Sequence, residues 1–117
     1  MSEIRLGAVE SKFADIIWNN EPLRTVELEK LAEAELNWKR TTTLTILKRL
    51  CERGIFQNKD RIITSLISRE EFYALQSEKF VNDTFEGSLP AFLTAFGSRK
   101  KLSDKEVEDL KKVICLL

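Results

Sequence analysis

Hydroxyl and cationic side chains gather on one face of the segment 37–54, and an apolar stripe follows the opposite face. The stripe has helical spacing and consists of Leu44, Leu47, Leu50 and Cys51. The polar face consists of Thr41, Thr42, Thr45, Lys48, Arg49 and Arg53, before an expected helix end at Gly54. Threonine hydroxyls and methyls can approach base edges in a DNA major groove, while lysine and arginine neutralise phosphates. The segment therefore has the chemistry of a DNA-reading helix. The solvated face of an ordinary amphipathic helix is the alternative interpretation.

The charge of the chain is segregated, although its sum is zero. The 117 residues include 19 basic and 19 acidic side chains. Residues 38–61 hold seven basic side chains against two acidic ones, while residues 3–35 hold eight acidic side chains against four basic ones. A local excess of positive charge attracts a polyanion even when the whole protein is neutral. The central segment is therefore compatible with nucleic-acid binding.

The composition argues against catalysis and against a bound metal ion. The chain has no histidine and only two thiols, Cys51 and Cys115, so it offers neither a zinc site nor a Ser-His or Cys-His pair. We therefore expect a protein that is not an enzyme and needs no cofactor, with both cysteines as small core residues. No apolar run approaches the roughly 20 residues of a membrane span, and the N-terminus has no signal-peptide pattern. These features predict a cytoplasmic protein without membrane insertion.

Three short helices are predicted in the first 54 residues. Apolar residues recur with helical spacing over 7–19, and Pro22 marks the end of that helix. Thr25 is a candidate N-cap for a second helix. The inward face of this second helix is predicted to comprise Val26, Leu28, Leu31 and Ala32. The third helix follows Asn37 after a tight link, which completes the helix-turn-helix pattern in which the third helix reads DNA.

A β-hairpin is predicted after Gly54, because the helical period of apolar residues ends there. Apolar pairs at 55–56 and 62–63 flank a polar tip, 57–61, which contains Lys59 and Arg61. A hairpin in this position is typical of a wing, which presents cations to the DNA backbone beside a recognition helix. A plain surface turn is the alternative.

The C-terminal part is predicted to be helical. Capping boxes at 68–71 and 103–106 open two helices, the first over about 69–85, and a short helix restarts at Ser88 and Pro90. The predicted fold class is mainly α with a small β-hairpin. It divides into an N-terminal winged helix-turn-helix domain, residues 1–68, and a C-terminal helical dimerisation domain, residues 69–117.

Aromatic rings crowd this C-terminal part. Five of the seven phenylalanines fall between residues 72 and 96, in a segment too small to enclose them. We therefore predict a homodimer. Its predicted interface comprises Phe72, Phe80, Phe85, Leu89, Phe92, Leu93, Phe96, Leu110 and Ile114. Packing of the rings on the N-terminal half, which would leave a monomer, is the alternative.

Three motifs make the chain resemble the BlaI/MecI/CopY repressors, bacterial regulators of β-lactam resistance and copper homeostasis. They are Trp38 with Thr42, Thr45, Arg49, Leu50 and Gly54; Ser68-Arg69-Glu70-Glu71-Phe72; and Phe85-Glu86-Gly87-Ser88-Leu89 with Phe92, Leu93, Phe96, Leu102 and Ser103. The resemblance runs over about residues 7–114. It implies an N-terminal winged-helix DNA-binding domain, a C-terminal helical dimerisation domain, and repression through a palindromic operator. For the β-lactam branch it also implies a membrane sensor protease, whose action leads to cleavage of the bond matching Ala95-Phe96.

The chain departs from this family at four places. Lys39-Arg40 replace the Ser-Pro that often follows the tryptophan, which adds positive charge at the start of the reading helix. The hairpin is shorter than usual and lacks an aromatic residue in its second strand. Cys115-Leu116-Leu117 stand where copper-responsive members have a Cys-x-Cys tail, so metal sensing is not expected. Ala95 stands where an asparagine often precedes the cleaved bond.

These observations define a predicted double-stranded DNA site. Its residues are Lys39, Arg40, Thr41, Thr42, Thr45, Lys48, Arg49, Lys59 and Arg61. Thr42 and Thr45 are expected at base edges and the cations at phosphates, while Trp38 is expected to pack. For Arg49, a salt bridge to an acidic residue of the first or second helix is the alternative. The alternative function is a winged-helix module that binds a protein instead of DNA, which would need an apolar outer face on the third helix.

Overall fold

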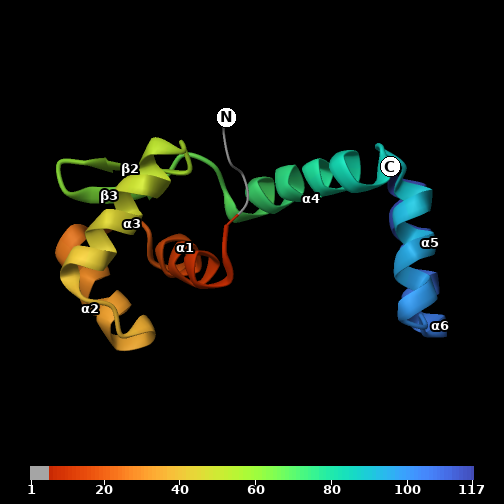
Figure 1. Ribbon diagram of the computed structural model, residues 1–117, viewed down its shortest axis with the longest axis horizontal. Helices are drawn as coiled ribbons and strands as arrows, with labels where there is room; N and C mark the ends of the chain where they lie inside the picture. Colours follow the sequence, from red (N-terminus) through yellow and green to blue (C-terminus); the bar gives the residue numbers. More distant parts are fainter. Residues whose placement is uncertain (1–5) are drawn as a thin grey trace. The chain divides into compact units, whose positions relative to one another are not determined.

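The computed structural model describes residues 6–117. The first residues of the predicted N-terminal domain, which also begin the stretch without a signal-peptide pattern, lie outside the described residues. Two compact units are present, Met1–Ser77 and Glu78–Leu117. The elements in Figure 1 are α1 (Ala8–Asn20), β1 (Leu23–Arg24), α2 (Thr25–Leu36), α3 (Arg40–Glu52), β2 (Phe56–Lys59), β3 (Ile62–Ser65), α4 (Arg69–Phe85), α5 (Leu89–Arg99) and α6 (Asp104–Leu116). The predicted fold class, mainly α with a small antiparallel sheet, is confirmed.

A three-stranded antiparallel sheet accompanies α1, α2 and α3 in the first unit. β2 and β3 form the predicted hairpin, in which Lys59 pairs with Ile62 across a turn made by Asp60 and Arg61. Both turn residues have positive φ, 54° and 64°, which suits the twist of a two-residue hairpin. The polar tip is therefore shorter than predicted. β1, which was not predicted, pairs with β3 and gives the strand order β1-β3-β2.

The helix-turn-helix link is as tight as predicted, but the start of α2 differs. The backbone N–H of Arg24 donates a hydrogen bond to the Glu27 carboxylate at 2.7 Å, and Thr25 is already helical. The prediction of Thr25 as the N-cap is therefore wrong, because β1 extends to the residue before it. At the other end Asn37 has a φ of 57°, a left-handed conformation that asparagine tolerates at helix ends. Only residues 37–39 separate α2 from α3.

One apolar core holds the first unit together. Its buried members are Phe13, Ala14, Ile16, Ile17, Leu23, Leu28, Ala32, Leu47, Leu50, Ile55, Phe56, Ile63 and Phe72. Trp38 packs against this core with its ring centroid 5.0 Å from that of Phe13, so its predicted packing role is confirmed. Val26 was predicted to face inward and is instead 46% exposed. It lies two residues before the buried Leu28, and with 3.6 residues per turn this places it on the opposite side of α2.

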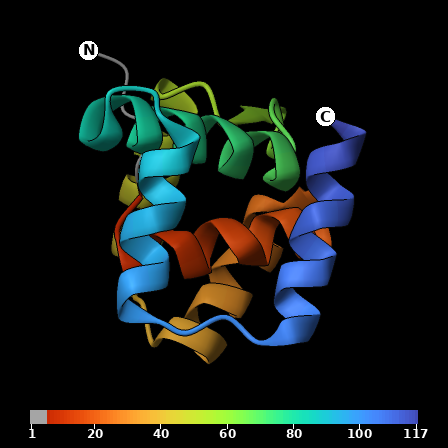
Figure 2. The same ribbon diagram turned by 90° about the vertical axis from the view of Figure 1, so that its right-hand side faces the viewer.

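The second unit contains α5, α6 and the end of α4, and α5 and α6 run in opposite directions (Figure 2). Ser88 caps α5 by accepting a hydrogen bond from the N–H of Ala91 at 3.1 Å. Ser103 and Glu106 exchange two hydrogen bonds, at 3.1 and 3.0 Å, and so form the predicted capping box of α6. The bonds that the Glu106 carboxylate accepts lower its pKa. Gly87 has a φ of 80° and makes the predicted break after α4.

The chain's only tyrosine reports on the packing of α4 against α1. The Tyr73 hydroxyl lies 3.5 Å from the Asp15 carboxylate, and partial burial together with this negative charge raises the pKa of the phenol. We expect Asp15→Asn to lower the pKa of Tyr73 towards its ordinary value, because the phenolate then meets no neighbouring carboxylate while its burial remains. Ultraviolet titration of phenolate absorbance measures this shift. Identical titrations of the two proteins would show that the Asp15 charge does not reach Tyr73.

Candidate nucleic-acid interface

α3 presents a straight polar stripe on the side opposite the core. Thr43, Leu47 and Leu50 are buried, and the buried Thr43 hydroxyl donates to the Lys39 carbonyl at 3.1 Å. With 3.6 residues per turn, the positions opposite these three are Thr41, Thr45, Lys48 and Glu52. All four are exposed, as are Lys39 and Thr42. The structure thus places the predicted hydroxyls and Lys48 on one accessible face, and it adds the carboxylate of Glu52, which was not predicted to lie on that face.

Carboxylates of neighbouring helices pair with two of the predicted DNA-binding arginines. Arg40 Nε lies 3.1 Å from Glu29 Oε1 of α2. Arg49 Nη1 lies 3.4 Å from Glu10 Oε2 of α1, so the salt bridge considered as the alternative for Arg49 is present. The two arginine side chains remain 72% and 52% exposed. Since a guanidinium has five N–H donors, each group keeps donors for a further anion.

The wing tip is attached to the start of α2. The Arg61 carbonyl accepts hydrogen bonds from the backbone N–H of Thr25 at 3.0 Å and from its hydroxyl at 3.3 Å. The side chains of Lys59 and Arg61 are exposed on β2 and the turn, where sequence reasoning expected them. Arg24 of β1 pairs with Ile62 of β3 and is a further exposed cation of this sheet. It was missed because a two-residue strand leaves no periodic signal.

The described acidic residues and thiols form no metal-binding cluster, and the two thiols differ in burial. No group of three or more Cys, Asp or Glu side chains within 6–117 is arranged to hold a metal ion. Cys51 is half-buried against the core, as predicted, and this burial raises the pKa of its thiol, which disfavours the reactive thiolate. Cys115 is exposed, so its predicted core position is wrong. Among the helices of residues 6–117, none is long and apolar enough to cross a membrane.

Aromatic rings form a continuous row in the second unit. The Phe92 ring centroid lies 6.1 Å from that of Phe80 and 5.6 Å from that of Phe85. Phe96 adjoins Phe92 on its own helix at 6.1 Å. Of the predicted interface residues, the exposed ones are Phe80, Leu89, Phe96 and Ile114, and the half-buried ones are Phe85, Phe92, Leu93 and Leu110. No residue within 78–117 is buried, all of these positions being described.

Phe72 does not belong to this row, which corrects the prediction for it. Its side chain is 1% exposed, and its ring lies 5.7 Å from that of Trp18 in the first unit. Trp18 also contacts Phe56 at 5.2 Å. Phe72 shares a helix with Phe80, which is why sequence reasoning grouped the two rings. The first turns of α4 pack on α1, so Phe72 is unavailable to a second chain.

An exposed cationic α3 that follows a tight link and precedes a β-hairpin defines a winged helix-turn-helix protein. The family model described as "Penicillinase repressor" matches residues 6–115, and the chain belongs to this family. It is therefore a transcriptional repressor and not an enzyme.

Curated relatives agree with this assignment at low sequence identity. A "Methicillin resistance regulatory protein MecI" of Staphylococcus aureus is 24% identical over 113 residues, which cover 93% of this chain and 92% of the relative. A "Penicillinase repressor" of Bacillus licheniformis is 22% identical over 114 residues, which cover 94% and 89%. A MecI protein of Mammaliicoccus sciuri is 23% identical over 113 residues, with 93% and 92% covered. The similarity spans nearly the whole chain and so includes both units.

Proposed function

We propose that this protein is a homodimeric repressor that binds a dyad-symmetric DNA operator in the cytoplasm, with α3 in the major groove and the wing on the backbone. The observation that carries this proposal is the outer stripe of α3. It combines two threonines and Lys48 with the single carboxylate of Glu52 on a face turned away from the core, and it contains no apolar side chain. This composition suits base edges and phosphates. It does not suit a protein-binding module, whose docking helix would need an apolar outer face.

The position of each residue around α3 decides which part of the DNA it is proposed to contact. Thr41 and Thr45 lie at the middle of the outer face, and together with Thr42 beside them they are proposed to meet base edges, with Lys48 on an adjacent phosphate. Thr42 and Arg49 lie seven residues apart on the flank that faces α1, as the pair between Arg49 and Glu10 requires.

Backbone contacts are proposed for the remaining cations. Lys39 and Arg40 precede or open α3, and Lys59 and Arg61 extend the positive surface onto the wing. All of these side chains are exposed. The attachment of the wing tip to Thr25 supports a wing of fixed position, which a phosphate contact needs.

The second unit supports the proposed dimer. Its rings are half-buried at best, and a 40-residue unit without a buried residue lacks the interior that stabilises a fold of its own. A second copy of the same apolar surface would cover the rings. Two α3 helices would then enter half-sites separated by about one helical turn or a multiple of it.

Relief of repression is proposed to follow an inducer-linked event. The names of the relatives connect them with methicillin resistance and penicillinase, so genes for β-lactam resistance are the proposed targets. A membrane sensor protease pathway acting on the Ala95-Phe96 bond is one route. This bond lies within α5, and Phe96 is 43% exposed.

Paired substitutions on α3 separate base reading from phosphate binding. We expect Thr45→Ala to weaken binding to the operator by about 1 to 3 kcal/mol and to leave binding to random DNA nearly unchanged, because its hydroxyl or methyl would contact a base. Lys48→Ala should weaken both alike, since a phosphate contact carries no sequence information. Fluorescence anisotropy titrations of both variants against both DNAs measure the difference. Equal losses for Thr45→Ala on the two DNAs would remove Thr45 from the base-reading set.

A further inference from the structure

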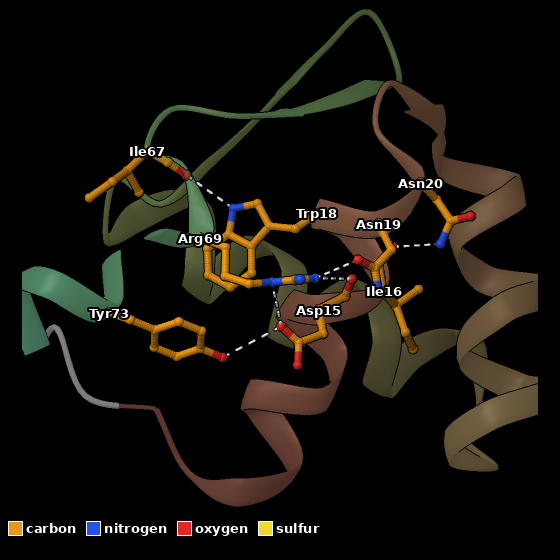
Figure 3. Close-up of polar contacts among 8 residues, drawn as sticks. All are labelled: Asp15, Ile16, Trp18, Asn19, Asn20, Ile67, Arg69 and Tyr73. Carbon is orange, nitrogen blue, oxygen red and sulfur yellow. Dashed lines mark hydrogen bonds and ion pairs between the residues drawn. The ribbon is translucent and has the colours of Figure 1, made fainter. Parts of the chain in front are cut away.

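Arg69, the first residue of α4, joins this helix to the last turns of α1 (Figure 3). Its Nε atom forms an ion pair with Asp15 Oδ1 at 3.1 Å, and its Nη2 atom donates a hydrogen bond to Asn19 Oδ1. Nη2 also lies 3.5 Å from the backbone carbonyl of Asp15. One planar guanidinium thus bridges two side chains that lie one turn apart on α1. A lysine at this position would have no fork with which to repeat that arrangement.

Trp18 supports the same arginine from a second direction. The guanidinium carbon of Arg69 lies 5.9 Å from the centroid of the Trp18 ring, within the range of a cation–π contact. The indole Nε1 of Trp18 donates a hydrogen bond to the Ile67 carbonyl at 3.0 Å, just before α4 begins. The group formed by Asp15, Trp18, Asn19, Ile67 and Arg69 is called the α1–α4 clamp below.

The clamp acts together with apolar packing on the same face of α4. Arg69, Phe72 and Tyr73 are three and four residues apart, so their side chains lie on one side of the helix. Phe72 is buried against Trp18, and Tyr73 reaches Asp15. Ser68 caps the helix by accepting the N–H of Glu71 at 3.1 Å. The first two turns of α4 are therefore held at several points around their base.

A firmly held base matters because α4 is long. With 17 residues it extends over about 25 Å, given a rise of 1.5 Å per residue. The clamp lies wholly in the first unit, and α4 continues past the boundary at Ser77 and Glu78, so the clamp fixes the direction in which the chain leaves the first unit. In the proposed dimer this direction bears on the distance and the rotation between the two α3 helices, and one base pair of spacer changes these by about 3.4 Å and roughly 35°.

We propose that the α1–α4 clamp sets the half-site separation that the repressor accepts, with Arg69 as a positioning residue that does not touch DNA. This inference rests on the proposed dimeric, operator-binding function. It assigns to the clamp the geometric part of operator specificity, whereas the stripe on α3 reads the bases.

The test compares the spacing preference of wild type and variants of the full chain. Duplexes with a randomised centre are first selected with the wild-type protein, and the selected half-site is then built into two kinds of probe. One probe carries a single half-site, and the other series carries two half-sites whose spacer changes by one base pair at a time. The variants are Arg69→Gln, Arg69→Lys and Asp15→Asn. The matched control is Lys105→Gln, which removes a cation from an exposed ion pair within α6. Thermal unfolding verifies that each variant is folded.

For wild type and control we expect an affinity loss of about tenfold or more when the spacer changes by one base pair, because simultaneous engagement of both half-sites is lost. For the three clamp variants this ratio should fall to about twofold, while their single half-site affinity stays within about twofold of wild type. Arg69→Lys is the decisive variant, since it keeps the charge and loses only the fork.

Each of the remaining outcomes would refute one part of the proposal. If the clamp variants discriminate between spacings as strongly as wild type, the clamp does not set the half-site separation. The same conclusion follows if wild type binds every spacing equally well. Neither result would contradict the proposed repressor function. A loss of single half-site affinity equal to the loss on the double site would reassign Arg69 to the stability of the first unit. Selection that enriches no DNA sequence would refute the proposed function itself.

Discussion

Raising the salt concentration from 50 to 200 mM is expected to lower the operator affinity of this protein by about three to five decades, if the dimer neutralises roughly six to ten phosphates. The net charge of zero does not prevent this, because residues 38–61 hold seven basic side chains against two acidic ones. Each phosphate contact releases condensed counterions, and added salt opposes that release. Anisotropy titrations at several salt concentrations give the slope.

Substitutions test which cations produce the salt dependence of operator affinity. Lys48→Ala should reduce it by about one for each subunit, whereas Lys105→Gln, whose cation pairs within α6, should leave it unchanged. Arg40 and Arg49 are already partly balanced by Glu29 and Glu10, so they should contribute less than fully open cations. Affinity that stays flat across this range of salt would refute DNA binding through the basic surface.

Truncation of the central ring of the second unit is expected to dissociate the proposed dimer. Phe92 contacts three other rings, so Phe92→Ala removes the residue on which the row depends. A ring that becomes enclosed in the dimer contributes about 3 to 5 kcal/mol, and since the dimer holds two copies of Phe92, the dissociation constant should rise by at least roughly two to three and a half decades. The variant should therefore be monomeric at micromolar concentration, as measured by sedimentation. Its operator affinity should fall as well, because a monomer loses the second half-site.

The first unit provides the control for this experiment. Leu66→Ala removes an apolar side chain that is 56% exposed in that unit, and it should change neither assembly nor operator affinity. The single half-site affinity of Phe92→Ala should persist, because α1, α2 and α3 have their own core. A wild-type monomer that binds its site tightly would contradict the dimer and assign the rings to another role.

Local patterns in the sequence determined most of the secondary structure. The spacing of Leu47 and Leu50 predicted the buried side of α3, and the pair of Ser103 and Glu106 predicted the start of α6. The change of period after Gly54 predicted the hairpin. These features depend on residues within one or two turns of each other, so their physical cause is present in the sequence itself. The order of the three family motifs along the chain predicted the family, and the family match covers both units.

Only the tertiary structure decided which of several available partners each side chain meets. Glu10 lies 39 positions before Arg49, and no local pattern distinguishes it from other carboxylates as the partner of that arginine. The same holds for β1, whose two residues form a strand because they pair with the edge of β3 that β2 does not occupy. Phe72 and Phe80 have the same chemistry and lie on one helix, but only Phe72 meets Trp18. In each case long-range packing selected among contacts that the sequence alone left equivalent, because contact energies depend on distance in space rather than along the chain.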